Sequence, residues 1–173
     1  MVQKVVMNVD KRWGLASVAM VLLFALAGCG TVSPQYPASA SAADVPTRLS
    51  PAQANEVTVY AIGLVGTPYR YGGNTPETGF DCSGLIGHVL RTRGGVASPR
   101  TVAKLQTWGQ SVPGEAVRTA DLVLFMQSGT AVHAGIYVGD GRFVHAPSTG
   151  GVVRLDDLRS PYWSSQRVAF RRP

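Results

Sequence analysis

The sequence predicts an α+β domain in which helices precede a small antiparallel sheet. Three observations carry this prediction. Apolar residues recur at helical spacing in the first half of the expected domain, and short runs rich in β-branched and aromatic residues fill the second half. A Gly139-Asp140-Gly141 turn signal between two of these runs indicates an antiparallel hairpin.

Three helices are expected from capping residues and apolar spacing. The first begins at Ser50-Pro51, an N-cap residue followed by proline at the first helical position, and ends before Gly66. The second begins after Asp81, a suitable N-cap, and closes at Gly94-Gly95. A third and shorter helix is expected over 101–108. The strands should then follow as a meander, with runs at 121–126, 132–138, 142–146, 151–154 and 167–170.

The N-terminal region has the features of a targeting segment. A basic stretch precedes the mostly apolar run 13–27, which is shorter than the roughly 20 apolar residues that cross a bilayer. The run ends in Leu26-Ala27-Gly28-Cys29, which resembles the bacterial lipobox. We therefore expect a lipoprotein signal peptide over 1–28 and lipid attachment at Cys29. An ordinary signal peptide that happens to precede a cysteine is the alternative.

Residues 29–49 are rich in proline, serine and alanine and hold few bulky apolar side chains, which predicts a disordered tether. The predicted domain then occupies 50–173. No aspartate follows Cys29, so by resemblance to other lipoproteins we expect attachment to the outer membrane, at the periplasmic face of the envelope. The formal charge of +6 comes without a long Lys/Arg run or a nucleic-acid motif, so a nucleic-acid partner is not expected.

Cys82 is the candidate nucleophile. It directly follows the N-cap Asp81, so it would lie in the first turn of a helix, where the helix dipole and free N–H groups favour a thiolate. The same N–H groups could hold a developing oxyanion. A buried free cysteine that packs as a small hydrophobe is the alternative that position alone leaves open.

Two of the three histidines fall where they could complete a catalytic group. His133 begins one expected strand and His145 ends the next, so a hairpin could bring the two rings into hydrogen-bond reach. His133 would then act as the base and His145 would orient it. His88 lies six residues after Cys82 on another side of the helix and is expected to be a packing or surface residue.

Six blocks in order resemble the NlpC family of cell-wall cysteine peptidases; they cover 69–73, 79–86, 99–101, 121–125, 133–139 and 143–147. This resemblance implies a papain-like fold, a triad of Cys82, His133 and His145, and D,L-endopeptidase action on peptidoglycan stem peptides. It also implies that Asp81, Ser83 and Tyr69 line the substrate cleft. Relatives often have Pro-Gly where this chain has Thr119-Ala120, so the turn that enters the following strand is expected to differ.

Other functions fit the sequence less well. Cys82, His133 and His145 could in principle hold zinc, but the usual zinc spacings are absent, so we expect neither a metal nor a cofactor. A catalytically weak domain that binds the wall or a partner lipoprotein is the alternative function, and an amide or ester outside the wall is an alternative substrate. A regulatory adaptor protein is possible, and the sequence does not identify one.

Overall fold

The computed structural model describes residues 45–173, which belong to one compact unit, Ser41–Pro173. The predicted signal peptide and the proposed lipid site at Cys29 lie outside the described residues. Within 45–173, none of the helices is both long enough and apolar enough to cross a membrane. The last residues of the predicted tether pack on the domain: Leu49 is buried in the core, and Arg48 N donates to the carbonyl of Pro173 at 2.8 Å.

The first two helices begin where their capping residues predict. Ser50 caps α2 (Pro51–Gly63) through a capping box with Gln53, and Asp81 caps α3 (Cys82–Val89) by accepting from Gly84 N. Helix α3 continues as a π-helical turn, η1 (Leu90–Gly94), and ends at Gly95 in the left-handed conformation.

Helix α4 (Val102–Leu105) is shorter than the expected 101–108. The side chain of the next residue, Gln106, bonds to the backbone of Gly129 and Ala131, and this fixes the chain against the sheet instead of extending the helix. The 3₁₀ turn η2 (Gly114–Ala116) and the short helix α5 (Pro161–Ser164) were not predicted.

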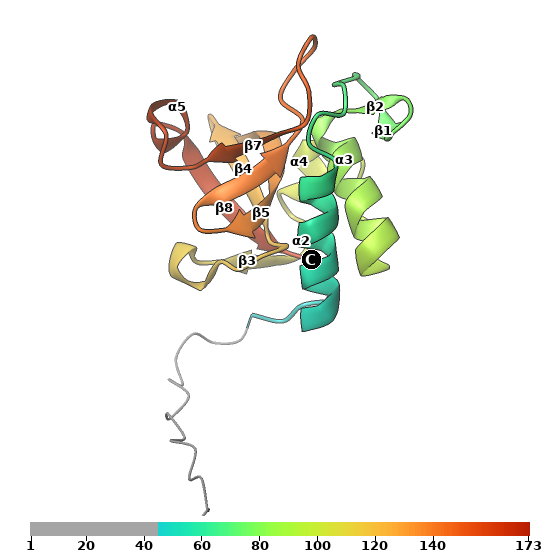
Figure 1. Cartoon of the computed structure of the whole chain (residues 1–173). Coiled ribbons are helices and arrows are strands. Elements are labelled where there is room, and N and C mark those ends of the chain that lie inside the picture. Colours follow the sequence, from blue (N-terminus) through green and yellow to red (C-terminus); the bar gives the residue numbers. More distant parts are fainter. Residues whose placement is uncertain (1–44) are drawn as a thin grey trace, which may run out of the picture. The chain divides into compact units, whose positions relative to one another are not determined.

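The main sheet is six-stranded and antiparallel throughout, in the order β3-β8-β4-β5-β6-β7 (Figure 1). Its strands are β3 (Gln110–Val112), β4 (Leu122–Gln127), β5 (Thr130–Gly139), β6 (Arg142–His145), β7 (Arg154–Asp157) and β8 (Arg167–Arg172). A separate two-stranded sheet, β1 (Asn74–Thr75) with β2 (Gly79–Phe80), lies directly before α3.

Two strand predictions need correction. The run 151–154 was expected as a strand, but β7 starts only at Arg154, because the carbonyl of Gly151 and the backbone of Val153 pair with the loop before β1. The simple meander holds only for β4 to β7, since β8 returns across the domain and lies between β3 and β4. The expected hairpin between β5 and β6 is confirmed: Asp140 and Gly141 both have positive φ, as a two-residue type I′ turn requires.

The turn into β4 has a non-glycine residue in an unusual conformation. Ala120 is buried and has φ of 70°, a region that glycine occupies more easily. The strand that follows forms as expected, so the Thr119-Ala120 departure changes the turn without displacing β4.

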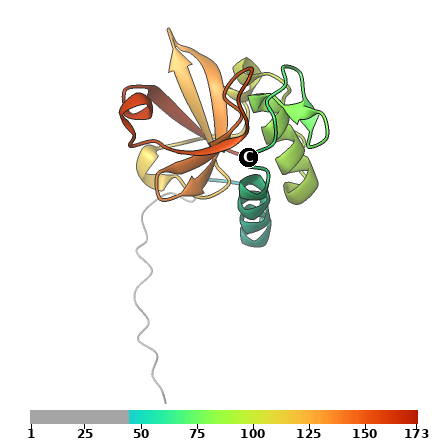
Figure 2. The same cartoon turned by 45° about the horizontal axis from the view of Figure 1, so that its top comes forward.

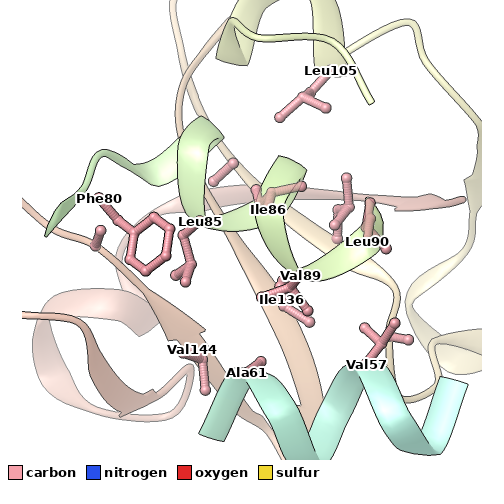
Figure 3. Close-up of a cluster of buried hydrophobic side chains, with 14 of the residues drawn as sticks. Val57, Ala61, Phe80, Leu85, Ile86, Val89, Leu90, Leu105, Ile136 and Val144 are labelled. Carbon is pink, nitrogen blue, oxygen red and sulfur yellow. The ribbon is translucent and has the colours of Figure 1, made fainter. Parts of the chain in front are cut away.

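Both faces of the sheet are covered, and this explains why β4 is an uninterrupted apolar run. Helices α2 and α3 lie together on one face, as Figure 2 shows. The core on that side joins Val57 and Ala61 of α2, Leu85 and Val89 of α3, and Ile136 of β5 (Figure 3). A smaller cluster on the opposite face contains Val123, Phe125, Phe143 and Trp163.

Candidate active site

Cys82 lies at the N-terminus of α3 and lines a cleft of about 530 Å³. The α3 side of this cleft carries Asp81 and Ser83, and the β5 side carries His133. We call it the Cys82 cleft; Tyr69, Tyr71, Gly72, Arg100, Thr101, Val102, Val132 and Pro147 complete its lining. The structure thus brings Cys82 and His133, which are far apart in sequence, to the walls of one cavity.

Opposing effects act on the pKa of the Cys82 thiol. Burial raises its pKa, and the negative charge of Asp81 adds to this effect. Backbone hydrogen bonds from Ser83, Ala134 and Cys82 itself oppose the rise without cancelling it. The backbone groups at the helix N-terminus thus favour the thiolate, while desolvation and the charge of Asp81 favour the thiol.

Arg100, which lies in the sequence block 99–101, fixes the N-terminal end of α3. Arg100 donates to both carboxylate oxygens of Asp81, at 2.7 and 3.0 Å, and to the hydroxyl of Ser83 at 2.7 Å. Asp81 also accepts from the backbone N–H of Gly72 and Gly84. Burial opposes ionisation of Asp81, but the hydrogen bonds from Arg100, Gly84 and Ser83 prevail and lower its pKa. The ionised side chain of Asp81 thus links α3 to the loop before it through hydrogen bonds.

His133 and His145 are in direct contact, with 2.8 Å between His133 Nε2 and His145 Nδ1. Both side chains project from the sheet face that carries Phe125 and Phe143, since their neighbours Ala134 and Val144 belong to the core on the helix side. Gly135 makes this contact possible, because a β-carbon there would lie 2.8 Å from a ring carbon of Phe143 and 3.2 Å from the β-carbon of His145.

Asp156 extends this chain of hydrogen bonds and was missed from the sequence. Its Oδ2 accepts from His145 Nε2 at 3.0 Å and from the indole N–H of Trp163 at 2.8 Å. Its Oδ1 accepts from Arg154 Nε at 2.8 Å. Asp156 belongs to β7, whereas the expected strand ended at residue 154. The alternation of Arg154-Leu155-Asp156 was the sequence signal that the strand continues to Asp156.

The ionised carboxylate of Asp156 fixes the tautomers of both histidines. Burial opposes its ionisation, but hydrogen bonds from Arg154, Trp163 and His145 prevail and lower its pKa, so it only accepts. His145 must then carry its proton on Nε2 and accept at Nδ1, and His133 must donate from Nε2. Nδ1 of His133 is then the unprotonated ring nitrogen, and His133 lines the Cys82 cleft.

Both histidines are neutral near pH 7. Burial, reinforced by the proximity of His145, lowers the pKa of His133 to about 4. Burial also lowers the pKa of His145, although its hydrogen bond to Asp156 opposes this. The resting site is therefore a neutral thiol and a neutral imidazole with a free lone pair.

The other predicted residues have separate places. Tyr69 lines the Cys82 cleft, and burial raises the pKa of its hydroxyl, with further contributions from Cys82 and Asp81. His88 lies away from the site, where its Nε2 is 2.9 Å from the hydroxyl of Tyr60 and its ring packs against Phe80. In the described part of the chain, no three His, Cys, Asp or Glu side chains are grouped to hold a metal ion.

Residues 66–172 match the NlpC/P60 family, and they include the whole Cys82 cleft and the chain from His133 to Asp156. The chain belongs to the NlpC/P60 family. This confirms the resemblance drawn from the six sequence blocks. Solved NlpC/P60 domains, which have a papain-like fold, share the α+β architecture, so the predicted fold class is confirmed as well.

Named members of the NlpC/P60 family align with most of the described region. The chain is 40% identical over 107 residues to the Escherichia coli K12 protein named murein DD-endopeptidase MepS/murein LD-carboxypeptidase, covering 62% of this chain and 56% of that one. It is 38% identical over 112 residues to murein DD-endopeptidase MepH of the same organism, covering 62% and 41%. The chain thus spans about half the length of these relatives.

Two solved NlpC/P60 structures show the same arrangement of elements. A family protein from Bacillus cereus is 29% identical, with a TM-score of 0.64 over 75% of this chain and 41% of that one. The NlpC/p60 domain of peptidoglycan hydrolase SagA is 27% identical, with a TM-score of 0.59 over 67% of this chain and 96% of that domain.

Proposed function

We propose that the protein hydrolyses peptide bonds in the stem peptides of peptidoglycan, with Cys82 as nucleophile. One observation carries the proposal: Cys82 and His133 line the same cleft, while the far nitrogen of His133 is held by His145 and, through it, by Asp156. The names of the Escherichia coli relatives support murein as the substrate class.

The reaction begins from the neutral pair. His133 Nδ1 takes the thiol proton as Cys82 Sγ attacks the scissile carbonyl, so the thiolate forms during the attack and not before it. His133 then gives that proton to the departing amine and leaves an acyl group on Sγ. Water, deprotonated by the same imidazole, hydrolyses the thioester and restores the thiol. His145 and Asp156 keep the reactive nitrogen pointed at the cleft and stabilise the transient imidazolium.

The N-terminus of α3 is placed to stabilise the charge that develops on the substrate. Backbone N–H groups of Cys82 and Ser83 lie beside Sγ and are placed to stabilise the oxyanion of the tetrahedral intermediate. Asp81, held ionised by Arg100, contributes negative charge that suits a free amine on the stem. Ser83 anchors Asp81 and Arg100, and Tyr69 offers a hydroxyl to the substrate backbone.

D,L-endopeptidase action is our proposal for the bond cut. The relative CwlT of Bacillus subtilis is named a bifunctional muramidase/DL-endopeptidase and is 37% identical over 115 residues, covering 65% of this chain and 34% of that one. The Escherichia coli names specify DD bonds instead, so product masses must decide. The lipobox-like segment supports attachment through Cys29 at the periplasmic side of the outer membrane, and acylation of Cys29 can be tested by metabolic labelling with palmitate.

Replacement of the nucleophile tests the proposal. Wild-type protein should release stem fragments from purified peptidoglycan, and Cys82→Ala should lower the rate by roughly 10³-fold or more, because the variant lacks the thiol that forms the acyl intermediate. Mass spectrometry of the soluble fragments measures the rate and identifies the bond. A chelator should leave the wild-type rate unchanged.

The matched controls use the histidines. His133→Ala should cost nearly as much as Cys82→Ala because the two act as a unit, whereas His88→Gln should retain activity since His88 contacts Tyr60 and Phe80 outside the cleft. Cleavage that persists in a folded Cys82→Ala variant would contradict the mechanism. Wall binding without cleavage by the wild type would favour the alternative, a catalytically weak binding protein of the same fold.

A further inference from the structure

A second pocket adjoins the Cys82 cleft on the far side of His133. Its volume is about 740 Å³, larger than the cleft itself. Val132, His133 and Pro147 line both cavities, so the two cavities adjoin at these three residues. The far wall of the second pocket is made by Arg154, Tyr162 and Trp163, and we call it the Trp163 pocket.

The two cavities suit the two halves of a cleaved peptide. The acyl half becomes bonded to Cys82, which lines only the Cys82 cleft. The other half leaves as an amine and must receive its proton from His133, which lines both cavities. A substrate bound with its acyl half in the Cys82 cleft and its scissile bond at His133 therefore extends its leaving half into the Trp163 pocket.

The charges of the Trp163 pocket indicate what that leaving half carries. Arg154 is the single Arg or Lys side chain among its lining residues, and it is 55% exposed. Only its Nε is engaged, by Asp156, and nothing else in 45–173 bonds to the terminal nitrogens of the guanidinium. The carboxylate of Asp157, which also lines the pocket, is already bound by Arg159 at 2.7 and 2.9 Å. A free guanidinium edge of this kind fits an incoming carboxylate.

We propose that the Trp163 pocket binds the amine-side half of the substrate and that Arg154 binds a carboxylate on that half. Tyr162, which is 66% exposed, and Trp163 supply an aromatic wall for the same half. This inference rests on the proposed function, because it assigns a second subsite to the same reaction. It predicts that peptides whose leaving half bears a free carboxylate are preferred substrates.

A pair of peptides with one acyl half tests the proposal. Their leaving halves are identical except that one bears a free carboxylate and the other the corresponding carboxamide. The wild-type kcat/KM should favour the carboxylate about tenfold, the usual effect of one charge-assisted hydrogen bond. Arg154→Gln should bring this ratio close to one, and Arg154→Lys should retain part of it. Arg142→Gln is the matched control, because Arg142 is half-exposed but lies outside the pocket, and it should keep the wild-type ratio.

The ratio of the two kcat/KM values distinguishes two roles of Arg154: binding of the substrate carboxylate and the hydrogen bond that it donates to Asp156. Weaker support would slow both peptides equally and leave the ratio unchanged, and that result in Arg154→Gln would overturn the proposal. So would a wild-type ratio near one. If the wild type cut neither peptide, the proposed function would fail instead. The binding of the two amine products to Cys82→Ala would then still test the subsite. Tighter binding of the carboxylate product, lost when Arg154→Gln is added, supports the subsite, and equal binding of the two products refutes it.

Discussion

At the scale of single residues, the protonation of His133 is the property with the widest consequences. Its pKa is about 4 in the folded chain, against 6.5 for an ordinary histidine. Between these values the unfolded chain binds a proton that the folded chain does not, so stability increases with pH across this range. The contribution is fully present above pH 6.5 and is lost as the pH falls toward 4.

This sign gives a measurable acid sensitivity. We expect the free energy of unfolding to fall by up to roughly 3 kcal/mol between pH 7 and pH 4 through His133 alone, as its shift implies. Urea unfolding at several pH values measures the loss. His133→Asn removes the titrating group and should flatten this part of the profile. An equally steep profile in that variant would show that another group is responsible.

Asp156 is the residue whose replacement best separates orientation from direct chemistry. Asp156→Asn removes the negative charge that forces the protons of His145 and His133 onto their Nε2 atoms. We expect kcat to fall about 10- to 100-fold, because the change affects the protonation and orientation of the base. Steady-state kinetics on a soluble stem peptide measures this loss. Asp157→Asn is the control, since that carboxylate is bound by Arg159 away from the histidines.

The sequence predicted individual site residues better than the bonds between them. Helix capping placed Cys82, and the hairpin signal placed the two histidines close together. The contributions of Asp156 and Arg100 could not be derived, because each depends on a chain segment that returns from a distance to meet a residue already placed. The effect of burial on protonation could not be derived either, because burial depends on the assembled domain.

At the scale of elements, the β5–β6 hairpin holds the site together, and Gly135 is its critical position. In Gly135→Ala the added methyl group would lie 2.8 Å from Phe143 and 2.9 Å from the carbonyl of Val144, so the strands must separate. We expect a loss of roughly 1–3 kcal/mol of stability, as overpacking typically costs, together with most of the activity. Thermal unfolding and fragment release measure the two effects.

A glycine with free space around it provides the comparison. At Gly114 an added β-carbon would meet no atom within 4 Å, and this glycine lies outside the site, so Gly114→Ala should change neither quantity noticeably. If Gly135→Ala behaved like Gly114→Ala, the close approach of β5 and β6 would not be needed for the histidine contact.

The elements differ in how far the sequence defines them. Helices α2 and α3 were predictable because their caps are local: Ser50 and Asp81 each bond to a backbone group three residues later. The bounds of β7 and the central position of β8 were not, since they depend on the pairing of β7 with β6 and of β8 with β3 and β4. Local chemistry therefore gave the helices and the hairpin, and the sheet order required the structure.

At the scale of the whole domain, a buried ion pair connects the last strand, β8, to the residue that precedes β4. Arg172 donates to both oxygens of Asp121 at 2.9 Å, and it also reaches the carbonyls of Ala116 and Val45. Arg172→Ala leaves Asp121 charged and without its guanidinium partner in the interior, so we expect a loss of about 3–5 kcal/mol. Urea unfolding measures it, and Arg167→Ala, an exposed arginine of the same strand, should change stability by well under 1 kcal/mol. Similar losses in the two variants would contradict the prediction.

The contacts around residues 45–49 also determine how the domain would respond to mechanical load. Thr47 and Arg48 bond to Pro173, and Val45 bonds to Arg172, so a pull on the chain before residue 45 first loads the end of β8. Because β8 is paired on both sides within the sheet, the load is shared by two rows of hydrogen bonds. If the N-terminal segment is attached to a membrane while the site is bound to a rigid polymer, tension on the chain therefore acts first on β8, a strand that is hydrogen-bonded to a neighbour on each side.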